Sequence, residues 1–251
     1  MKMTETRRFS EALGSWMHFE ACCFRAGLFS ESSLKSAIGS VASSLHANHM
    51  AARVHADYPL PAIQRVPSGE ATTSRGRKRC VDFALIYDDG RQPPSEPFLL
   101  IEGKWAGSSH CTTENIMTDF VRLSIMKRAR PGATCLFVLA GHSKDIHAVL
   151  SHRPFTGTRG DVIHSNGTGA ITKFKFREND MEHQRAFAQL VSDFHAANIK
   201  VPASFSTSGS TPYPAAPAKF KAAAWEVRIV NSQNLVANQW PPPKRLSLIH
   251  I

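Results

Sequence analysis

The sequence predicts an α/β (α+β) fold in which helices flank a mixed central sheet, with core elements in the order αβββαβ. Stretches with helical spacing at 30–50 and 113–129 enclose strand-like stretches at 80–90 and 98–106. The wholly apolar stretch 134–141 follows the second helix and is typical of a strand buried on both faces. Strands that alternate with amphipathic helices favour a sheet with helices on its faces.

Two helices are expected before the first strand. Residues 1–27 form a predicted helical extension, because their apolar residues have mixed helical spacing and Gly27 is a suitable stop. The second helix begins with candidate N-cap serines, and its apolar residues keep a/d spacing: Leu34, Ile38, Val41 and Leu45. Glu31 lies three residues before Leu34 and therefore continues the inward stripe of this helix.

The remaining elements follow from shorter patterns. An extended segment at 53–61 precedes a polar loop rich in Gly, Ser and Arg. After the apolar strand we expect a helix, a strand and a helix, at 143–153, 170–176 and 180–198. We assign residues 28–200 to one domain, and the Pro/Ser/Ala-rich residues 201–251 to a linker with a C-terminal strand and tail.

Composition indicates a polyanionic partner and a reducing compartment. Lys and Arg number 30 against 20 Asp and Glu, which gives a formal charge of +10 and favours a polyanion such as nucleic acid as a partner. The five cysteines form no CxxC pair, which argues against a disulfide framework and a zinc knuckle. We see no secretory signal and no apolar run of about eighteen residues, so we expect a cytoplasmic protein that does not enter a membrane.

One expected hairpin carries charges in an otherwise apolar setting. Side chains alternate along a strand, so Glu102 and Lys104 share one face of "FLLIEGKWA". A turn centred near Gln92 sets Asp82, on the preceding strand, directly across from Glu102. Facing like charges are destabilising unless a cation lies between them, and hard oxygen ligands suit Mg²⁺ or Mn²⁺. The pattern therefore predicts a divalent-metal site with a lysine one pleat away.

These residues resemble the PD-(D/E)xK nuclease superfamily, which has the restriction-endonuclease-like fold. Asp82 in "VDFALI" and Glu102 and Lys104 in "IEGKW" match its motif on successive strands. Glu31 matches the glutamate that many members carry on the preceding helix. The resemblance covers roughly residues 28–140 and departs from the family pattern at Val81, where the family's proline would stand.

The resemblance implies a core of helix, three strands, helix and strand, and metal-dependent hydrolysis of DNA, in defence against foreign DNA or in repair. The implied site consists of the metal ligands Asp82, Glu102 and the carbonyl of Gly103, the catalytic Lys104, and the supporting Glu31. On the following helix, Asp119 and Arg122 lie three residues apart and are candidates to face the site or a phosphate.

A basic loop before the aspartate strand is a candidate contact for phosphates. Its four cations are Arg75, Arg77, Lys78 and Arg79. The alternative is a solvated loop, which basic runs often form. DNA is the expected partner and RNA a less favoured one, since no RNA-binding motif is visible. A second copy of the chain or a protein partner, bound through residues 201–251, is a further candidate.

Other functions stay open at this point. The chain could be a catalytically inactive nuclease-fold module that binds DNA or serves in an assembly. An RNA-directed nuclease is a third hypothesis. The histidines form no HExxH pattern, and Cys111 beside His110 is a candidate thiol nucleophile, although a lone cysteine is more often inert.

Overall fold

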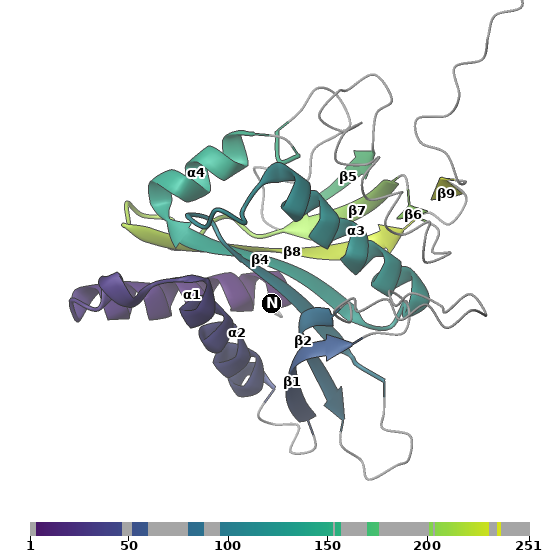
Figure 1. The fold of residues 1–251 in the computed structure, drawn as a ribbon, viewed down its shortest axis with the longest axis horizontal. Helices are drawn as coiled ribbons and strands as arrows, with labels where there is room; N and C mark the ends of the chain where they lie inside the picture. Colours follow the sequence, from purple (N-terminus) through teal and green to yellow (C-terminus); the bar gives the residue numbers. More distant parts are fainter. Residues whose placement is uncertain are drawn as a thin grey trace, which may run out of the picture.

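A computed structural model of the chain places a mixed sheet between two layers of helices (Figure 1). The described residues are 4–46, 52–59, 80–87, 96–152, 154–156, 170–175, 201–202, 204–230 and 235–236. The helices are α1 (Glu5–Cys22), the short 3-10 helix η1 (Ala26–Leu28), α2 (Glu31–Leu45), α3 (Thr113–Ala129) and α4 (Ser143–Ser151). The strands are β1 (Ala52–Pro59), β2 (Cys80–Tyr87), β3 (Leu99–Trp105), β4 (Thr134–His142), β5 (Ile171–Lys175), β6 (Val201–Pro202), β7 (Ser204–Gly209), β8 (Phe220–Val230) and β9 (Leu235–Val236).

The main sheet has the strand order β1-β2-β3-β4-β8-β7-β5 among the described strands. Strands β3 and β4 are parallel, and the other neighbours in the sheet are antiparallel. Helix α3 links β3 to β4, because two parallel neighbours need a crossover connection. The prediction of a mixed sheet flanked by helices is confirmed, and the elements from α2 to β4 follow in the predicted order.

Helices α1 and α2 cover one face of the sheet, and α3 and α4 cover the other (Figure 1). Strand β4 is buried between these layers. Its residues Cys135 and Phe137 pack in the cluster under α3, whereas Leu136 and Val138 pack in the cluster under α1 and α2. The predicted burial of 134–141 on both faces is therefore confirmed.

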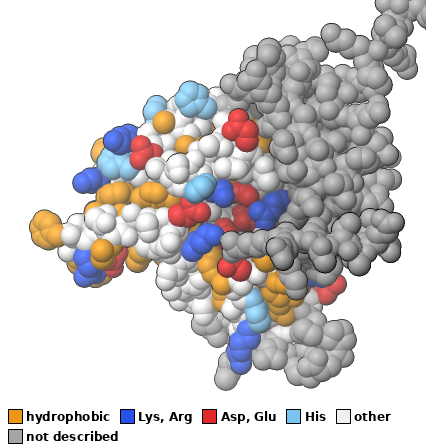
Figure 2. Space-filling model, viewed as in Figure 1, with side chains coloured by type: hydrophobic (Ala, Val, Ile, Leu, Met, Phe, Trp, Pro, Cys, Tyr) orange, Lys and Arg blue, Asp and Glu red, His pale blue; other side chains and the backbone are white. Residues whose placement is uncertain are grey.

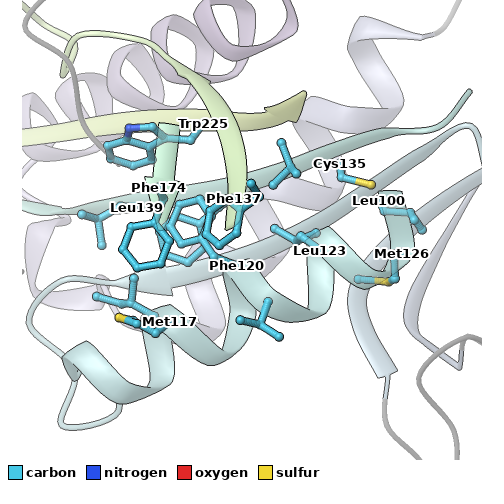
Figure 3. Packing of buried hydrophobic residues seen from close by; sticks show 14 of the residues in the cluster. Leu100, Met117, Phe120, Leu123, Met126, Cys135, Phe137, Leu139, Phe174 and Trp225 are labelled. Carbon is cyan, nitrogen blue, oxygen red and sulfur yellow. The ribbon is translucent and has the colours of Figure 1, made fainter. Parts of the chain in front are cut away.

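The layer between α3 and the sheet is rich in aromatic rings (Figure 3). The ring centroids of Phe120 and Phe137 are 4.6 Å apart, and those of Phe137 and Trp225 are 6.0 Å apart. Met117 and Leu123 of α3 join this cluster. Since each such side chain stabilises the fold by about 1.5–3 kcal/mol when fully buried, this packing holds α3, and the charged residues on it, in place against the sheet.

Helix α2 begins at a side-chain cap, which fixes where its first charged residue lies. The Ser30 hydroxyl accepts a hydrogen bond from the Ser33 N–H at 3.2 Å, and the Ser33 hydroxyl accepts one from the Ser30 N–H at 2.8 Å. This reciprocal pair satisfies donors that the first turn of a helix leaves open. It confirms the expected helix start and places Glu31 in the first turn.

The C-terminal region differs from its predicted division. Strand β8 lies between β4 and β7 in the main sheet, so a boundary at residue 200 would pass through the sheet. Ala222 and Ala224 pack toward α1, whereas Ala223 and Trp225 pack toward α3. The predicted C-terminal strand is confirmed as β8, and its small alanines allow α1, from the predicted N-terminal extension, to lie directly on it.

The shorter predicted elements have mixed outcomes. The helix at 143–153 and the strand at 170–176 are confirmed as α4 and β5. The predicted helix at 180–198 and the basic loop at 75–79 lie outside the described residues. Across the part of the chain that the structure describes, no helix has the length and apolar character needed to cross a membrane.

Candidate functional site

The candidate site lies where the pairing of β2 with β3 ends. The last pair of the ladder is Phe83 with Ile101, which is the register that a turn centred near Gln92 predicts, and Asp82 and Glu102 are the next residues along the two strands. Beyond this pair, Asp82 Oδ2 accepts a hydrogen bond from the Gly103 N–H at 2.9 Å. A side-chain carboxylate therefore binds the backbone of β3 between the two charged residues of the motif.

Gly103 is a point of close approach between α2 and β3. A Cβ atom at this position would lie 2.6 Å from Ile38 Cδ1, closer than two carbon atoms can approach without a shift. The glycine between Glu102 and Lys104 thus lets α2 pack directly on the strand.

Lys35 of α2 binds Asp82. Its Nζ lies 2.6 Å from Asp82 Oδ1, while Gly103 occupies the other oxygen. Partial burial lowers the pKa of Lys35, but the hydrogen bond and the charge of Asp82 raise this pKa more, so it lies above its usual value. The pair remains open to water, since 37% of the lysine side chain is exposed.

Glu102 belongs to the α3 side of the site and is buried, with 2% of its surface exposed. Arg122 Nη2 of α3 lies 3.0 Å from Glu102 Oε1. This oxygen accepts no hydrogen bond of regular geometry from the described residues, so we treat the contact as an ion pair. Burial raises the pKa of Glu102 well above its usual range, and the charge of Arg122 opposes the shift only in part.

Arg122 of α3 also contacts the start of β2 and a second buried carboxylate, that of Asp119 on its own helix. Its Nη1 lies 3.3 Å from Asp119 Oδ1, and its Nη2 donates to the Cys80 carbonyl at the start of β2. Lys104 Nζ lies 3.0 Å from Asp119 Oδ2. Burial lowers the pKa of Lys104, but the charge and hydrogen bond of Asp119 raise it more, so the ammonium is retained at neutral pH. Burial also raises the pKa of Asp119.

Glu31 lies at the border of this cluster. Its Oε2 accepts a hydrogen bond from Ser108 Oγ at 2.9 Å, in the turn that follows β3. The glutamate therefore reaches the end of the strand that carries Lys104. Nearby, burial raises the pKa of Cys111 to about 11, so its thiol stays protonated at neutral pH, which disfavours the thiol-nucleophile hypothesis.

Four residues predicted for the site therefore lie together, with Glu31 at their border: Asp82, Glu102, Gly103 and Lys104. Arg122, predicted to contact nucleic acid, binds carboxylates inside the cluster, and its contact with nucleic acid stays a prediction. The other predicted phosphate contacts lie outside the described residues: Arg75, Arg77, Lys78 and Arg79.

Sequence reasoning missed Lys35. The signal was available, since Lys35 follows Glu31 by four residues and therefore lies on the same face of α2. The sequence pattern indicates Asp119 only as a candidate to face the site or a phosphate. It lies next to Phe120 on the buried side of α3, and a carboxylate among buried apolar residues indicates a nearby cation.

The cluster is formally neutral. Figure 2 shows acidic and basic side chains interspersed in the middle of one face of the molecule. In the site, three carboxylates meet three cations in the pairs Lys35–Asp82, Arg122–Glu102 and Lys104–Asp119. These charges compensate one another, as buried charges must.

The carboxylate oxygens of the site are suitable ligands for a hard divalent cation. In the structure, however, these oxygens form ion pairs with Lys35 and Arg122. Asp82 and Glu102 supply carboxylate oxygens, and Glu102 Oε1 is buried without a regular hydrogen bond. No three His, Cys, Asp or Glu side chains of the described residues are grouped as ligands of one metal ion. Binding of an ion by Asp82 and Glu102 therefore requires Lys35 and Arg122 to give way.

Comparison of the chain with protein-family models, with curated proteins and with solved structures gives no match. The arrangement of the site itself is therefore the ground for a functional proposal.

Proposed function

We propose that this chain is a divalent-metal-dependent nuclease of the PD-(D/E)xK type that hydrolyses phosphodiester bonds of DNA. One observation carries the proposal: Asp82 is hydrogen-bonded to β3 between Glu102 and Lys104, so that the three motif residues lie at one point of the sheet. Ionisable groups gathered with raised carboxylate pKa values, as at Glu102, are typical of functional sites.

The order of elements supports a restriction-endonuclease-like core within this proposal. Helix α2 precedes β1, β2 and β3, and α3 and β4 follow. The motif aspartate lies on β2, the motif glutamate and lysine on β3, and Glu31 on α2, which are the places that the resemblance implies. Strands β7 and β8 would then be additions to this core on the far side of β4.

Each residue has a proposed role in hydrolysis. Asp82 and Glu102 would hold Mg²⁺ or Mn²⁺, with the Gly103 carbonyl as a further donor. The bound ion would supply a more acidic water and neutralise charge on the scissile phosphate. Lys104, kept protonated beside Asp119, would stabilise charge that develops on that phosphate. Glu31, held by Ser108, would orient a water molecule.

The formal charge of +10 supports a polyanionic substrate. DNA is the substrate that we propose, with RNA as the less favoured alternative, and defence against foreign DNA or repair as the proposed setting. The loop at 75–79 and Arg122 are proposed contacts for phosphates. A homodimer would place two sites on one duplex.

Cleavage assays test this proposal. Purified protein is incubated with linear, circular and single-stranded DNA and with RNA, in Mg²⁺, Mn²⁺ or chelator. We expect metal-dependent cutting of DNA that falls at least about 100-fold in Lys104→Gln, because a group that stabilises transition-state charge is lost. Lys144→Gln, on the exposed surface of α4, is the matched control and retains activity. Equal activity in Lys104→Gln and the parent would refute the proposal.

A second candidate function is a catalytically inactive nuclease-fold module that binds DNA or serves in an assembly. The ion pairs favour it, because each of Asp82, Glu102 and Asp119 already has a cationic partner within 3.3 Å. Such a network could be purely structural. This function predicts salt-sensitive DNA binding that does not depend on Mg²⁺ or on Lys104→Gln, with no cleavage under any condition.

A further inference from the structure

The two proposed metal ligands are held by cations that come from opposite helical layers. Lys35 of α2 lies 2.6 Å from Asp82, and Arg122 of α3 lies 3.0 Å from Glu102. The two carboxylates come from neighbouring strands at the end of one ladder. The site is therefore flanked by one cation from each layer.

The contacts of these cations are directed at the carboxylates that a metal would need. Arg122 contacts Glu102 with Nη2 and Asp119 with Nη1. Lys35 binds Asp82 at Oδ1, the oxygen that the Gly103 N–H leaves open. A divalent cation bound to Asp82 and Glu102 would lie close to an ammonium and a guanidinium, and like charges at such separations repel strongly in a partly buried site.

We propose that Lys35 and Arg122 are resident counter-ions that compete with the divalent cation for Asp82 and Glu102. This inference rests on the proposed function, because it takes these two carboxylates as the metal ligands. The two cations hold the carboxylates in place without a metal and set the concentration of metal at which the site fills. Loading of the site then requires both cations to move away from the carboxylate oxygens.

The two counter-ions differ in how readily they move. The Lys35 side chain is 37% exposed and can turn into water on its flexible stem. The Arg122 side chain is 18% exposed and is also tied to Asp119 and to the Cys80 carbonyl. Arg122 is therefore the stronger competitor, and its removal has the larger effect on metal binding.

Calorimetric titration of the full chain with Mn²⁺ alone, at neutral pH and without DNA, tests the inference. We expect Lys35→Gln to lower the Kd for Mn²⁺ by about tenfold and Arg122→Gln to lower it more, since each removes a positive charge beside a ligand. Arg7→Gln is the matched control, because Arg7 pairs with Glu11 on the exposed side of α1, and we expect the Kd of this variant to equal that of the parent.

An unchanged or higher Kd in Lys35→Gln would overturn the inference, and so would the absence of Mn²⁺ binding in every variant. Circular dichroism checks the fold of Arg122→Gln. If that variant is unfolded, the Kd of Lys35→Gln alone tests the inference, because the Lys35 side chain is partly exposed and its replacement leaves the protein folded. DNA cleavage is measured separately. Protein that shows the predicted Kd changes but cuts no DNA would refute the nuclease function and leave the counter-ion role standing.

Discussion

The two sides of the candidate site differ in their access to water. On the α2 side, the Lys35–Asp82 pair is partly exposed. On the α3 side, Arg122 joins Glu102 and Asp119, whose side chains are almost fully buried. An ion pair in water contributes little to stability, whereas a buried pair is costly to break because a charge is left uncompensated. The ion pairs on the α3 side therefore contribute more to the stability of the fold, and Lys35 on the α2 side leaves its carboxylate more readily than Arg122 does.

The largest expected effect comes from breaking the buried side. Arg122→Met leaves the Glu102 and Asp119 carboxylates without their guanidinium, so we expect the free energy of unfolding to fall by about 3–5 kcal/mol. Urea denaturation followed by circular dichroism measures the change. Arg7→Met, at an exposed pair on α1, serves as the control and costs less than about 1 kcal/mol. If Arg122→Met lowered the free energy of unfolding by an equally small amount, the buried pairs would contribute no more to stability than an exposed pair does.

A second prediction concerns the contact that brings α2 onto β3. In Gly103→Ala the new methyl group meets Ile38 Cδ1, so we expect a loss of about 1–2 kcal/mol in the free energy of unfolding. Ile38→Val removes that carbon atom. The same glycine substitution made in the Ile38→Val protein is therefore expected to cost less, and equal costs in both backgrounds would show that the close approach does not constrain position 103.

The pH dependence of stability tests the burial of the Glu102 carboxylate. Because burial raises the pKa of Glu102 in the folded protein, the unfolded chain loses this proton first, near the usual value of 4.5. Stability contributed by the protonated form is thus lost as the pH rises above that value. We expect Glu102→Gln, which cannot ionise, to gain stability relative to the parent in urea denaturation as the pH rises from about 4.5 to neutral. A constant difference across this range would contradict a raised pKa.

The smallest expected effect is on the exposed side. Lys35→Gln removes the partner of Asp82, but water reaches the pair, so the free energy of unfolding falls by less than about 1 kcal/mol. Urea denaturation of this variant beside Arg122→Met compares the two sides directly. A larger loss in Lys35→Gln than in Arg122→Met would reverse our assignment of the structural side.

The local parts of this site could be predicted from sequence. A turn near Gln92 fixes the register of a hairpin, so the pairing of Phe83 with Ile101, next to Asp82 and Glu102, followed from counting. The position of Glu31 followed in the same way from helical spacing and a serine cap. These predictions depend on residues that are close in sequence, or on one short turn.

The parts that depend on packing between distant segments could not be predicted. Which cation meets which carboxylate is decided by how α2 and α3 lie on the sheet, and Lys35 reaches Asp82 across 47 positions of sequence. The C-terminal strand was predicted and is confirmed as β8, but its place in the main sheet was not predicted, for a related reason. Its pairing with β4 and β7 joins segments that are far apart in sequence, and the approach of α1 and α3 from its two sides makes its small residues suitable for the middle of a sheet.

The most direct test of the proposed nuclease is cleavage of supercoiled plasmid DNA by the parent and by Asp82→Asn, with matched folding checked by circular dichroism. The asparagine keeps the size of the side chain but removes the charge needed to hold Mg²⁺. We predict nicking or linearisation by the parent in Mg²⁺, none in chelator, and none by the variant. Equal cleavage by the two proteins, or cleavage that persists in chelator, would contradict the metal-dependent nuclease.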